Sequence, residues 1–383
     1  MNIDTELSDW LTQREGAGLR RALTTVEARR GMEYRVNGRW YVSFCSNDYL
    51  GLADDDCTRQ GARDALEQWG CGAGASRLVS GDLAIIRELE TELAAWKQTE
   101  AALVYPSGYM ANIGVISALA GPGDTVFIDR LAHASLVDGT RLSRARLRVF
   151  PHNDFERLDT LLGNVSARRT IVITESVFSM DGDTAPLRAL SMVCKKHGAL
   201  LMVDEAHALG VYGGGRGLVN AEGLSGKIDV LVGTLSKAIG SQGGFAAGSR
   251  KLCDYLVNTS RSFIYTTGIN PAAAGAAIAA LHCLKHDSTR IDKLWYNISR
   301  FRSQVSDLRI MGQGPICPVM TGTALAACTR ARLLAEEGYL APAIRPPTVP
   351  EGGARMRVTL SALHSPEQID RFARVLIDTA NRQ

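Results

Sequence analysis

An acidic residue and a lysine each come at the end of an apolar run of this chain. Asp204 closes the run 199–204, and Lys237 follows a second run, 228–234. Both runs have the length and apolar content of buried parallel strands. In an open α/β sheet, ligands bind outside the carboxyl ends of the strands. The sequence therefore predicts an α/β protein that presents a carboxylate and an amine at one binding edge.

This pair meets two requirements of pyridoxal phosphate (PLP). A lysine can form a Schiff base with the aldehyde of the cofactor. A carboxylate can hold a proton on the pyridine nitrogen, so that the ring accepts electrons. Taken singly, Asp204 is equally explained as a turn cap and Lys237 as a solvated surface lysine. Together, at the ends of two neighbouring strands, they predict a PLP site.

Three further strands end near candidate cofactor contacts. After the run 101–105, Gly108 lets the backbone approach a ligand closely, and the first N–H groups of the helix that follows form a phosphate site. His133 follows the run 125–129 and can stack on the pyridine ring. Ser179 follows the run 169–175 and, like His207, can reach the ring oxygen. The alternative for each is structural, since a serine often caps a turn and a histidine is often a core residue.

The composition excludes several classes of protein. The 383 residues are 45% apolar, enough for more than one domain, and the net charge of +3 is scattered rather than gathered into a nucleic-acid footprint. The eight cysteines form no Cys-x-x-Cys pair and no zinc spacing, so we expect reduced thiols, no metal and a cytoplasmic protein. The start of the chain lacks a signal-peptide pattern. The uncharged stretch 262–284 contains Asn270 and Pro271, so we expect a strand followed by a buried helix there and no membrane span.

The chain divides into three zones. Residues 1–45 predict an arm, with an amphipathic helix that uses Leu7, Trp10 and Leu11, and then a hairpin turned by Asn37-Gly38. Residues 46–287 alternate apolar runs with helical periods, which predicts a large PLP-binding domain around a mostly parallel sheet. Residues 288–383 predict a smaller α+β domain with a long helix near 291–308.

Four sequence blocks carry a family resemblance: 46–52 (Ser-Asn-Asp-Tyr-Leu-Gly-Leu), the Ser107-Gly-Tyr region, 204–210 and 233–240. On these blocks the chain resembles the α-oxoamine synthases, PLP-dependent enzymes with the aspartate-aminotransferase fold (fold type I). The resemblance extends over essentially the whole chain. Within the family, the segments 152–154, 179–183 and above all 343–350 resemble the biotin-pathway branch.

The resemblance implies a decarboxylative condensation of L-alanine with a pimeloyl thioester, carried by CoA or by acyl carrier protein. The products would be 8-amino-7-oxononanoate, CO2 and the free thiol. It also implies a homodimer with the active site at the subunit interface, where Thr266 or Thr267 would reach the phosphate bound by the partner.

The resemblance also implies roles for individual residues. Lys237 would form the Schiff base and remove the α-proton, and Asp204 would pair with the pyridinium nitrogen. The remaining roles are ring stacking for His133, contact with the ring oxygen for Ser179 and His207, phosphate binding for Thr234 and the Gly108–Tyr109 backbone, substrate carboxylate binding for Asn47 and Arg357, and acyl-donor binding for Arg21 and Thr348.

The role of Arg357 also follows from its own segment. Between 355 and 360 a period of two places Arg355, Arg357 and Thr359 on one face of a strand, with apolar residues on the other. A guanidinium can grip a carboxylate with two parallel hydrogen bonds. The alternative is a pair of solvated arginines on an edge strand.

Two rival functions differ in class. The first is another α-oxoamine synthase, which would use glycine or serine with a different acyl thioester. The second is a catalytically silent partner subunit, which we would expect to lack the Schiff-base lysine. The presence of Lys237 argues against the second.

Overall fold

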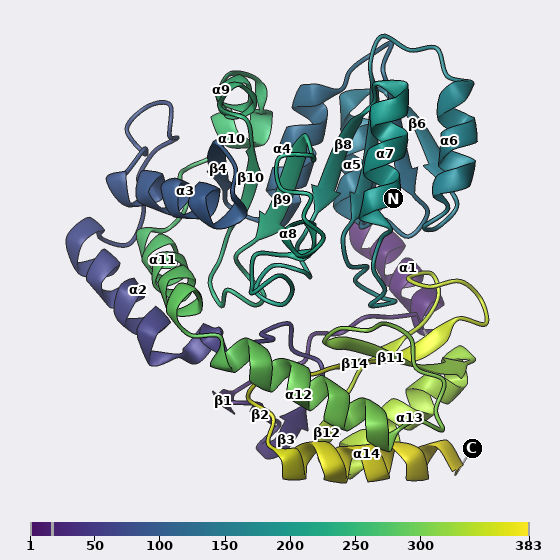
Figure 1. Ribbon diagram of the computed structural model, residues 1–383. Coiled ribbons are helices and arrows are strands. Elements are labelled where there is room, and N and C mark those ends of the chain that lie inside the picture. Colours follow the sequence, from purple (N-terminus) through teal and green to yellow (C-terminus); the bar gives the residue numbers. More distant parts are fainter. Residues whose placement is uncertain (1, 17–18, 382–383) are drawn as a thin grey trace.

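The computed structural model describes residues 2–16 and 19–381. It confirms the predicted α/β class and the mostly parallel central sheet (Figure 1). β10 is antiparallel to both of its neighbours in this sheet, and the other pairs run parallel. The strand order is β4 (Ala101–Tyr105), β10 (Gly244–Gly248), β9 (Val230–Thr234), β8 (Leu200–Asp204), β7 (Thr170–Glu175), β5 (Thr125–Asp129) and β6 (Arg146–Phe150).

The central strands are buried on both faces, as their continuous apolar runs predict. Along β7, Ile171 and Ile173 enter one hydrophobic core and Val172 enters the other. The first core is covered by α4 (Gly108–Leu119), α5 (Ala134–Ser143), α9 (Arg250–Thr259) and α10 (Arg261–Ile264). The second is covered by α2 (Asp56–Trp69), α3 (Ala84–Lys97), α6 (Phe155–Gly163), α7 (Leu187–His197), α8 (Leu218–Ala221) and α11 (Pro271–His286), together with the short helix η1 (Leu52–Asp54).

The C-terminal elements form a smaller layer below the central sheet in Figure 1. Its three-stranded sheet has the order β11 (Ile316–Gly322), β14 (Ala354–Thr359) and β13 (Ala343–Ile344). Its helices are α12 (Thr289–Gln304), α13 (Ala324–Glu336) and α14 (Pro366–Asn381). The long helix predicted near 291–308 is therefore present as α12, slightly earlier in the chain.

The N-terminal hairpin joins this smaller layer. Its strands β1 (Ala28–Arg30), β2 (Glu33–Val36) and β3 (Arg39–Ser43) are followed in the sheet by β12 (Tyr339–Leu340), which pairs in parallel with β3. Asn37 and Gly38 turn the hairpin with φ values of 47° and 75°, in the left-handed region that such a two-residue turn requires. The domain boundaries at 45 and 287 stay predictions.

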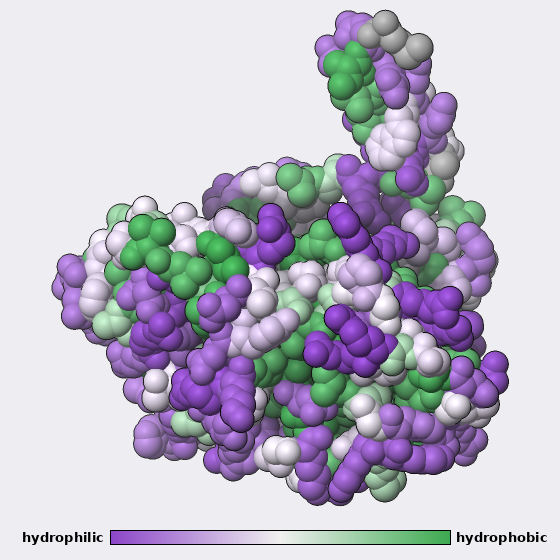
Figure 2. All heavy atoms as spheres, turned by 90° about the horizontal axis from the view of Figure 1, so that it is seen from above, coloured by the Kyte–Doolittle hydropathy of each residue, from purple (hydrophilic) through white to green (hydrophobic). Residues whose placement is uncertain are grey.

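Helix α1 (Ile3–Gly16) is present as predicted, but none of its residues is buried. Leu7, Trp10 and Leu11 are 52%, 53% and 39% exposed. In Figure 2 the helix extends away from the body of the molecule. The expected packing of an apolar face against this chain is therefore wrong, because the helix has no surface of its own chain beneath it.

The strand predicted at the start of 262–284 is also wrong. The segment begins inside α10, whose Phe263 packs edge-on against Tyr105 of β4, and a loop follows. The buried helix is confirmed as α11, where the Asn270 side chain accepts from the N–H of Ala272 at 2.8 Å and Pro271 takes the first position. Among residues 2–16 and 19–381, no helix is long and apolar enough to cross a membrane.

A buried ion pair fixes the loop that follows β8. Lys97, the last residue of α3, is 1% exposed and pairs with Glu205, the residue after Asp204. The Lys97 ammonium also donates to the Asn220 side chain of α8 at 2.8 Å, and Glu205 accepts from the N–H of Val219 at 2.9 Å. The pair thus ties two helices to the segment that carries Asp204.

Loss of this cation should be costly. Lys97→Met should lower the free energy of unfolding by about 3–5 kcal/mol, because Glu205 would remain buried without its cation. The double variant Lys97→Met/Glu205→Gln should recover most of the loss. As a control, Lys227→Met at an exposed lysine should change stability by about 0.5 kcal/mol or less. Urea unfolding measures all three, and a Lys97→Met protein as stable as the parent would contradict this account.

Candidate active site

A cavity of about 230 Å³ opens at the carboxyl ends of the central strands. Each strand ends in a loop that brings a polar side chain to this edge, as the sequence predicts. Among the predicted site residues, the cavity is lined by Gly108, Tyr109, His133, Asp204, His207, Thr234 and Lys237. It is also lined by residues that the sequence analysis did not select: Ser107, Asn112, Ser135, Glu175, Ala206 and Ser236.

Asp204 is held in place by two donors. It is 6% exposed, and its Oδ1 atom accepts from the N–H of Ala206 at 2.8 Å. Its Oδ2 atom accepts from the Asn112 side chain at 2.7 Å. A carboxylate has about four acceptor positions, so Asp204 retains capacity for a further donor from a ligand. Asn112 could have been found as the one polar amide within an otherwise apolar helix segment four residues after Gly108.

Lys237 and His207 form a close pair. The Lys237 Nζ atom lies 2.8 Å from His207 Nε2. Burial lowers the pKa of Lys237 to about 8, although the charges of Asp204 and Glu175 act in the opposite direction. Burial, and then the charge of Lys237, hold the pKa of His207 well below its usual value. Lys237 is thus close to the condition in which its amine is neutral and reactive at physiological pH.

Glu175 is a site carboxylate that the sequence analysis missed. It is the last residue of β7, is 3% exposed and faces Asp204 across the sheet. Its Oε1 atom accepts from the backbone N–H of His133 at 2.6 Å. Burial, and then the Asp204 charge, raise its pKa to about 8. The signal was available, because Glu175 ends a buried run in the same way as Asp204.

His133 and the start of α4 form the other walls. The His133 ring is exposed at the cavity mouth, and its Nδ1 atom lies 2.8 Å from Ser135 Oγ, so a face of the ring can meet a ligand. Helix α4 begins at Gly108, and the first N–H groups of an α-helix have no acceptor within the helix. A Cβ atom on Gly108 would lie 3.2 Å from Thr234 Cβ, so the close approach favours glycine. The Thr234 hydroxyl donates to the carbonyl of Gly243 at 2.9 Å.

The two arginines of β14 have different partners. All six residues of this strand are buried, so the alternative of solvated arginines is wrong. Arg355 pairs with Asp181 at 2.5 Å. Arg357 donates through Nε to the carbonyl of Ser179 at 2.8 Å and through Nη2 to Asn47 Oδ1 at 3.2 Å. Within the part of the chain that the structure describes, Arg357 has no carboxylate partner, so its buried charge is available to an anionic ligand.

The remaining predicted residues lie outside the PLP cavity. Ser179 contacts Arg357 through its carbonyl, and Thr266 lies on the loop after α10. Arg21 and Thr348 line one cavity of about 470 Å³ together with Trp10 and Arg345. The structure thus brings the two proposed acyl-donor residues together, and separates them from the residues that line the PLP cavity.

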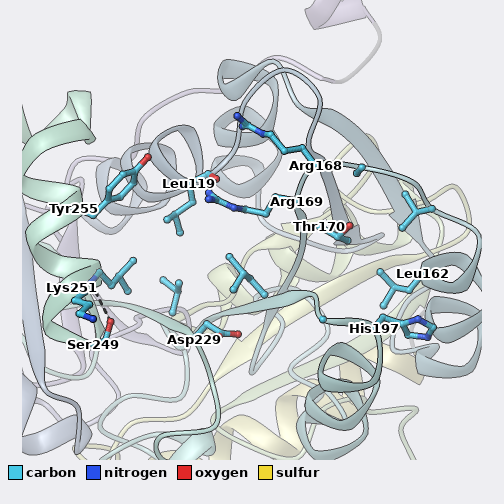
Figure 3. A pocket seen from close by; sticks show the side chains of 16 residues that line it. Leu119, Leu162, Arg168, Arg169, Thr170, His197, Asp229, Ser249, Lys251 and Tyr255 are labelled. Atoms are coloured by element: carbon cyan, nitrogen blue, oxygen red, sulfur yellow. Dashed lines mark hydrogen bonds between the residues drawn. The ribbon is translucent and has the colours of Figure 1, made fainter.

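The largest cavity, of about 710 Å³, lies at the opposite edge of the sheet (Figure 3). It is lined by the first residues of β7, β8 and β9. Its cations are already engaged: Arg168 by Asp124 at 2.8 Å, and His197 by Asp159 at 2.6 Å. A large volume without convergent reactive groups does not make an active site. Elsewhere too, no group of three metal-ligating side chains occurs within residues 2–16 and 19–381.

The comparisons with known proteins agree with this geometry. The family described as aminotransferase class I and II matches residues 40–376. The chain is 46% identical over 376 residues to the 8-amino-7-oxononanoate synthase of Anaeromyxobacter sp. (strain K), with 96% of this chain and 94% of that protein covered. It is 47% identical over 372 residues to the enzyme of the same name from Alkalilimnicola ehrlichii, with 95% of each covered. The chain belongs to the 8-amino-7-oxononanoate synthase family. Members of this family are PLP-dependent enzymes of the class I and II aminotransferase fold.

A solved structure extends the comparison to the cofactor. A serine palmitoyltransferase variant from S. paucimobilis, with a bound PLP–myriocin aldimine, has a TM-score of 0.93 and 30% identity, covering 98% of this chain and 97% of that one. The cavity described above fits PLP on its own evidence. It holds a lysine of lowered pKa, a carboxylate with spare acceptor capacity and a helix start for a phosphate. It also holds Asn112 Oδ1, which is buried and has no partner among the described residues.

Lys237 should be the point of covalent attachment. Borohydride reduction of the PLP-loaded protein should fix the cofactor on Lys237, as seen by peptide mass spectrometry, and Lys237→Ala should retain none. Because only a neutral amine attacks an aldehyde, covalent loading of cofactor-free protein should speed up with rising pH and be half-maximal near pH 8. Lys251→Ala, at the opposite edge of the sheet, is the control and should load fully. Trapping on a different lysine would contradict the assignment.

Proposed function

We propose that this protein condenses L-alanine with a pimeloyl thioester, giving 8-amino-7-oxononanoate, CO2 and the free thiol. The observation that carries the proposal is the arrangement of Lys237 and Arg357. A reactive amine in the PLP cavity is connected through His207, Tyr49 and Asn47 to a buried arginine without a carboxylate partner. This is what an α-amino acid requires, with its amine at the cofactor and its carboxylate at the arginine. The names of the curated relatives support the choice of substrates.

The bound cofactor supplies an aldehyde for the amino group and a ring that accepts the electron pair left at the α-carbon. Asp204 holds positive charge at the pyridine nitrogen, and Asn112 and the N–H of Ala206 fix the direction of its two oxygens. Lys237 accepts the α-proton of the amino acid, which its lowered pKa favours near neutral pH. Arg357 and Asn47 orient the substrate carboxylate, which is the group lost as CO2.

The acyl donor takes the second cavity in this proposal. Arg21 and Thr348 line it, and its further arginines, Arg14, Arg20 and Arg345, suit the phosphates of CoA or an acidic carrier protein. Apolar walls from Trp10, Leu11 and Ile344 suit the methylene chain of the acyl group.

We also propose that the enzyme works as a homodimer. Thr266 lies outside its own PLP cavity and next to Tyr265, which is 71% exposed. A second copy placed against this loop would bring Thr266 to the cofactor phosphate of the partner. The exposed apolar residues of α1 give further surface for such contact.

One specific observation favours a second candidate. The similarity to serine palmitoyltransferase extends over nearly the whole chain, so a synthase that uses serine or glycine shares this fold. Product identification separates the two. Mass spectrometry of incubations with pimeloyl-CoA or pimeloyl-acyl carrier protein should show the 8-amino-7-oxononanoate mass with L-alanine, and much less product with glycine or L-serine. Preferential turnover of serine or glycine would favour the second candidate.

Removal of the Arg357 guanidinium should weaken amino-acid binding selectively. Arg357→Ala should weaken L-alanine binding, followed by the change in cofactor absorbance, by about 2–5 kcal/mol, the range for stripping one partner from a buried charge pair. Arg357→Lys should restore only part, because an ammonium cannot reproduce the guanidinium fork. PLP loading and thioester binding should change little. Unchanged L-alanine affinity in Arg357→Ala would move the carboxylate site elsewhere, and Arg355, already paired with Asp181, would be tested next.

A further inference from the structure

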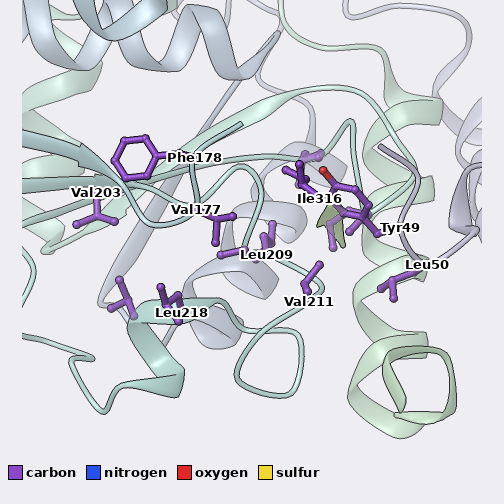
Figure 4. Close-up of a cluster of buried hydrophobic side chains, with 14 of the residues drawn as sticks. Tyr49, Leu50, Val177, Phe178, Val203, Leu209, Val211, Leu218 and Ile316 are labelled. Carbon is purple, nitrogen blue, oxygen red and sulfur yellow. The ribbon is translucent and has the colours of Figure 1, made fainter. Parts of the chain in front are cut away.

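Tyr49 is a buried residue next to the PLP cavity that no role above includes. It belongs to the segment between β3 and η1, and its side chain is 0% exposed. Figure 4 shows its ring close to Ile316 and Leu50, within a cluster of buried hydrophobic side chains. Its carbonyl accepts from the N–H of Ala362 at 2.8 Å. The position of the phenol is therefore fixed by packing and by the backbone.

The Tyr49 hydroxyl has two polar partners from different parts of the site. It lies 2.7 Å from His207 Nδ1 and 3.2 Å from Asn47 Oδ1. Burial raises the pKa of Tyr49 to about 12, so the phenol stays protonated at neutral pH and has one proton to donate. A buried hydroxyl that satisfies two neighbours in this way restricts the orientation of both.

Each partner of Tyr49 contacts a residue with a proposed chemical role. His207 uses its other ring nitrogen, Nε2, against Lys237 at 2.8 Å. Asn47 uses the same oxygen to accept from Arg357 Nη2 at 3.2 Å. A continuous chain of hydrogen bonds thus connects the lysine to the arginine, and Tyr49 stands at its centre.

The direction of these bonds determines the tautomer of His207. When Tyr49 donates to Asn47, Nδ1 of His207 carries a proton and donates to the phenol oxygen, which leaves Nε2 as an acceptor facing Lys237. When Tyr49 donates to His207 instead, Nε2 carries the proton. A group that occupies Arg357 and Asn47 changes the acceptors available to Tyr49. The state of His207 next to Lys237 thereby responds to the carboxylate site.

We propose that Tyr49 is a positioning residue, whose hydroxyl holds His207 in one tautomer against Lys237 and couples this pair to the Asn47–Arg357 carboxylate site. The coupling rests on the proposed function, whereas the control of the His207 tautomer does not. Tyr49 acts through His207 and Asn47 rather than on the reacting atoms.

The tautomer can be measured without turnover. The chain has seven histidines, and ¹⁵N-histidine NMR distinguishes a protonated ring nitrogen from an unprotonated one. His207→Asn identifies the His207 signals by their loss. In the parent protein His207 should show a single neutral tautomer, because its pKa is well below the usual value. In Tyr49→Phe the two nitrogen signals should move together toward a mixture of tautomers.

A second variant tests the coupling and guards against a folding defect. Asn47 contacts Tyr49 and Arg357 in the printed hydrogen bonds, so Asn47→Ala should move the His207 signals through Tyr49 alone. The control is Tyr105→Phe, which also removes a buried hydroxyl, bonded to Ser260 at 3.0 Å, and should leave His207 unchanged. Circular dichroism confirms that each variant is folded.

The L-alanine titration completes the test. Tyr49→Phe should weaken L-alanine binding by about 3- to 10-fold, as expected for loss of one hydrogen bond in the chain, while thioester binding and PLP loading stay as in the parent. Unchanged His207 signals in folded Tyr49→Phe and Asn47→Ala would overturn the proposal. So would equal losses for L-alanine and thioester, which indicate a general structural defect. If the parent itself fails to bind L-alanine, the proposed function fails, and the NMR result still decides the role of Tyr49.

Discussion

Burial of the central strands on both faces is the constraint on which the rest of this structure depends. Because helices cover each face of the sheet, the strands contribute little polar chemistry along their length. Polar side chains appear where the strands end, and in parallel strands these ends meet at one edge. Glu175, Asp204 and Thr234 are each the last residue of a strand, and they line one cavity. The fold thus concentrates charge at a single place.

Concentrated charge in a poorly solvated cavity alters the chemistry of each group. Burial lowers the pKa of Lys237 and raises that of Glu175, each to about 8. Two carboxylates side by side oppose each other's ionisation, while both favour a charged lysine. The site also needs rigid support, which Lys97 and Glu205 provide from beneath. Their pairing allows the loop after β8 to carry Asp204 and His207 without rearrangement.

The smaller layer completes the site by supplying a charge that the sheet edge lacks. β14 delivers two buried arginines to the loop after β7, and their partners make them different. Arg355 is neutralised by Asp181, so it links the two layers. Arg357 meets only a carbonyl and an amide oxygen, so it keeps a net charge for a ligand. The Tyr49 hydroxyl then lies between this charge and the lysine.

The sequence by itself determined the α/β class, the strands of the central sheet and the residues at their ends, because apolar runs of strand length fix what is buried and where it stops. It also indicated Lys237 and Asp204, since both follow such runs, and family blocks added Asn47, Arg357, Arg21 and Thr348. It did not determine the environment of α1 or of the segment after Ser260, where packing rather than local pattern decides burial. Only the tertiary structure showed that Asn112 grips Asp204, that Glu175 adds a second buried carboxylate, and that Arg357 rather than Arg355 lacks a carboxylate partner. These are contacts between residues far apart in the chain, and their distances depend on how helices and strands pack, which no local pattern encodes.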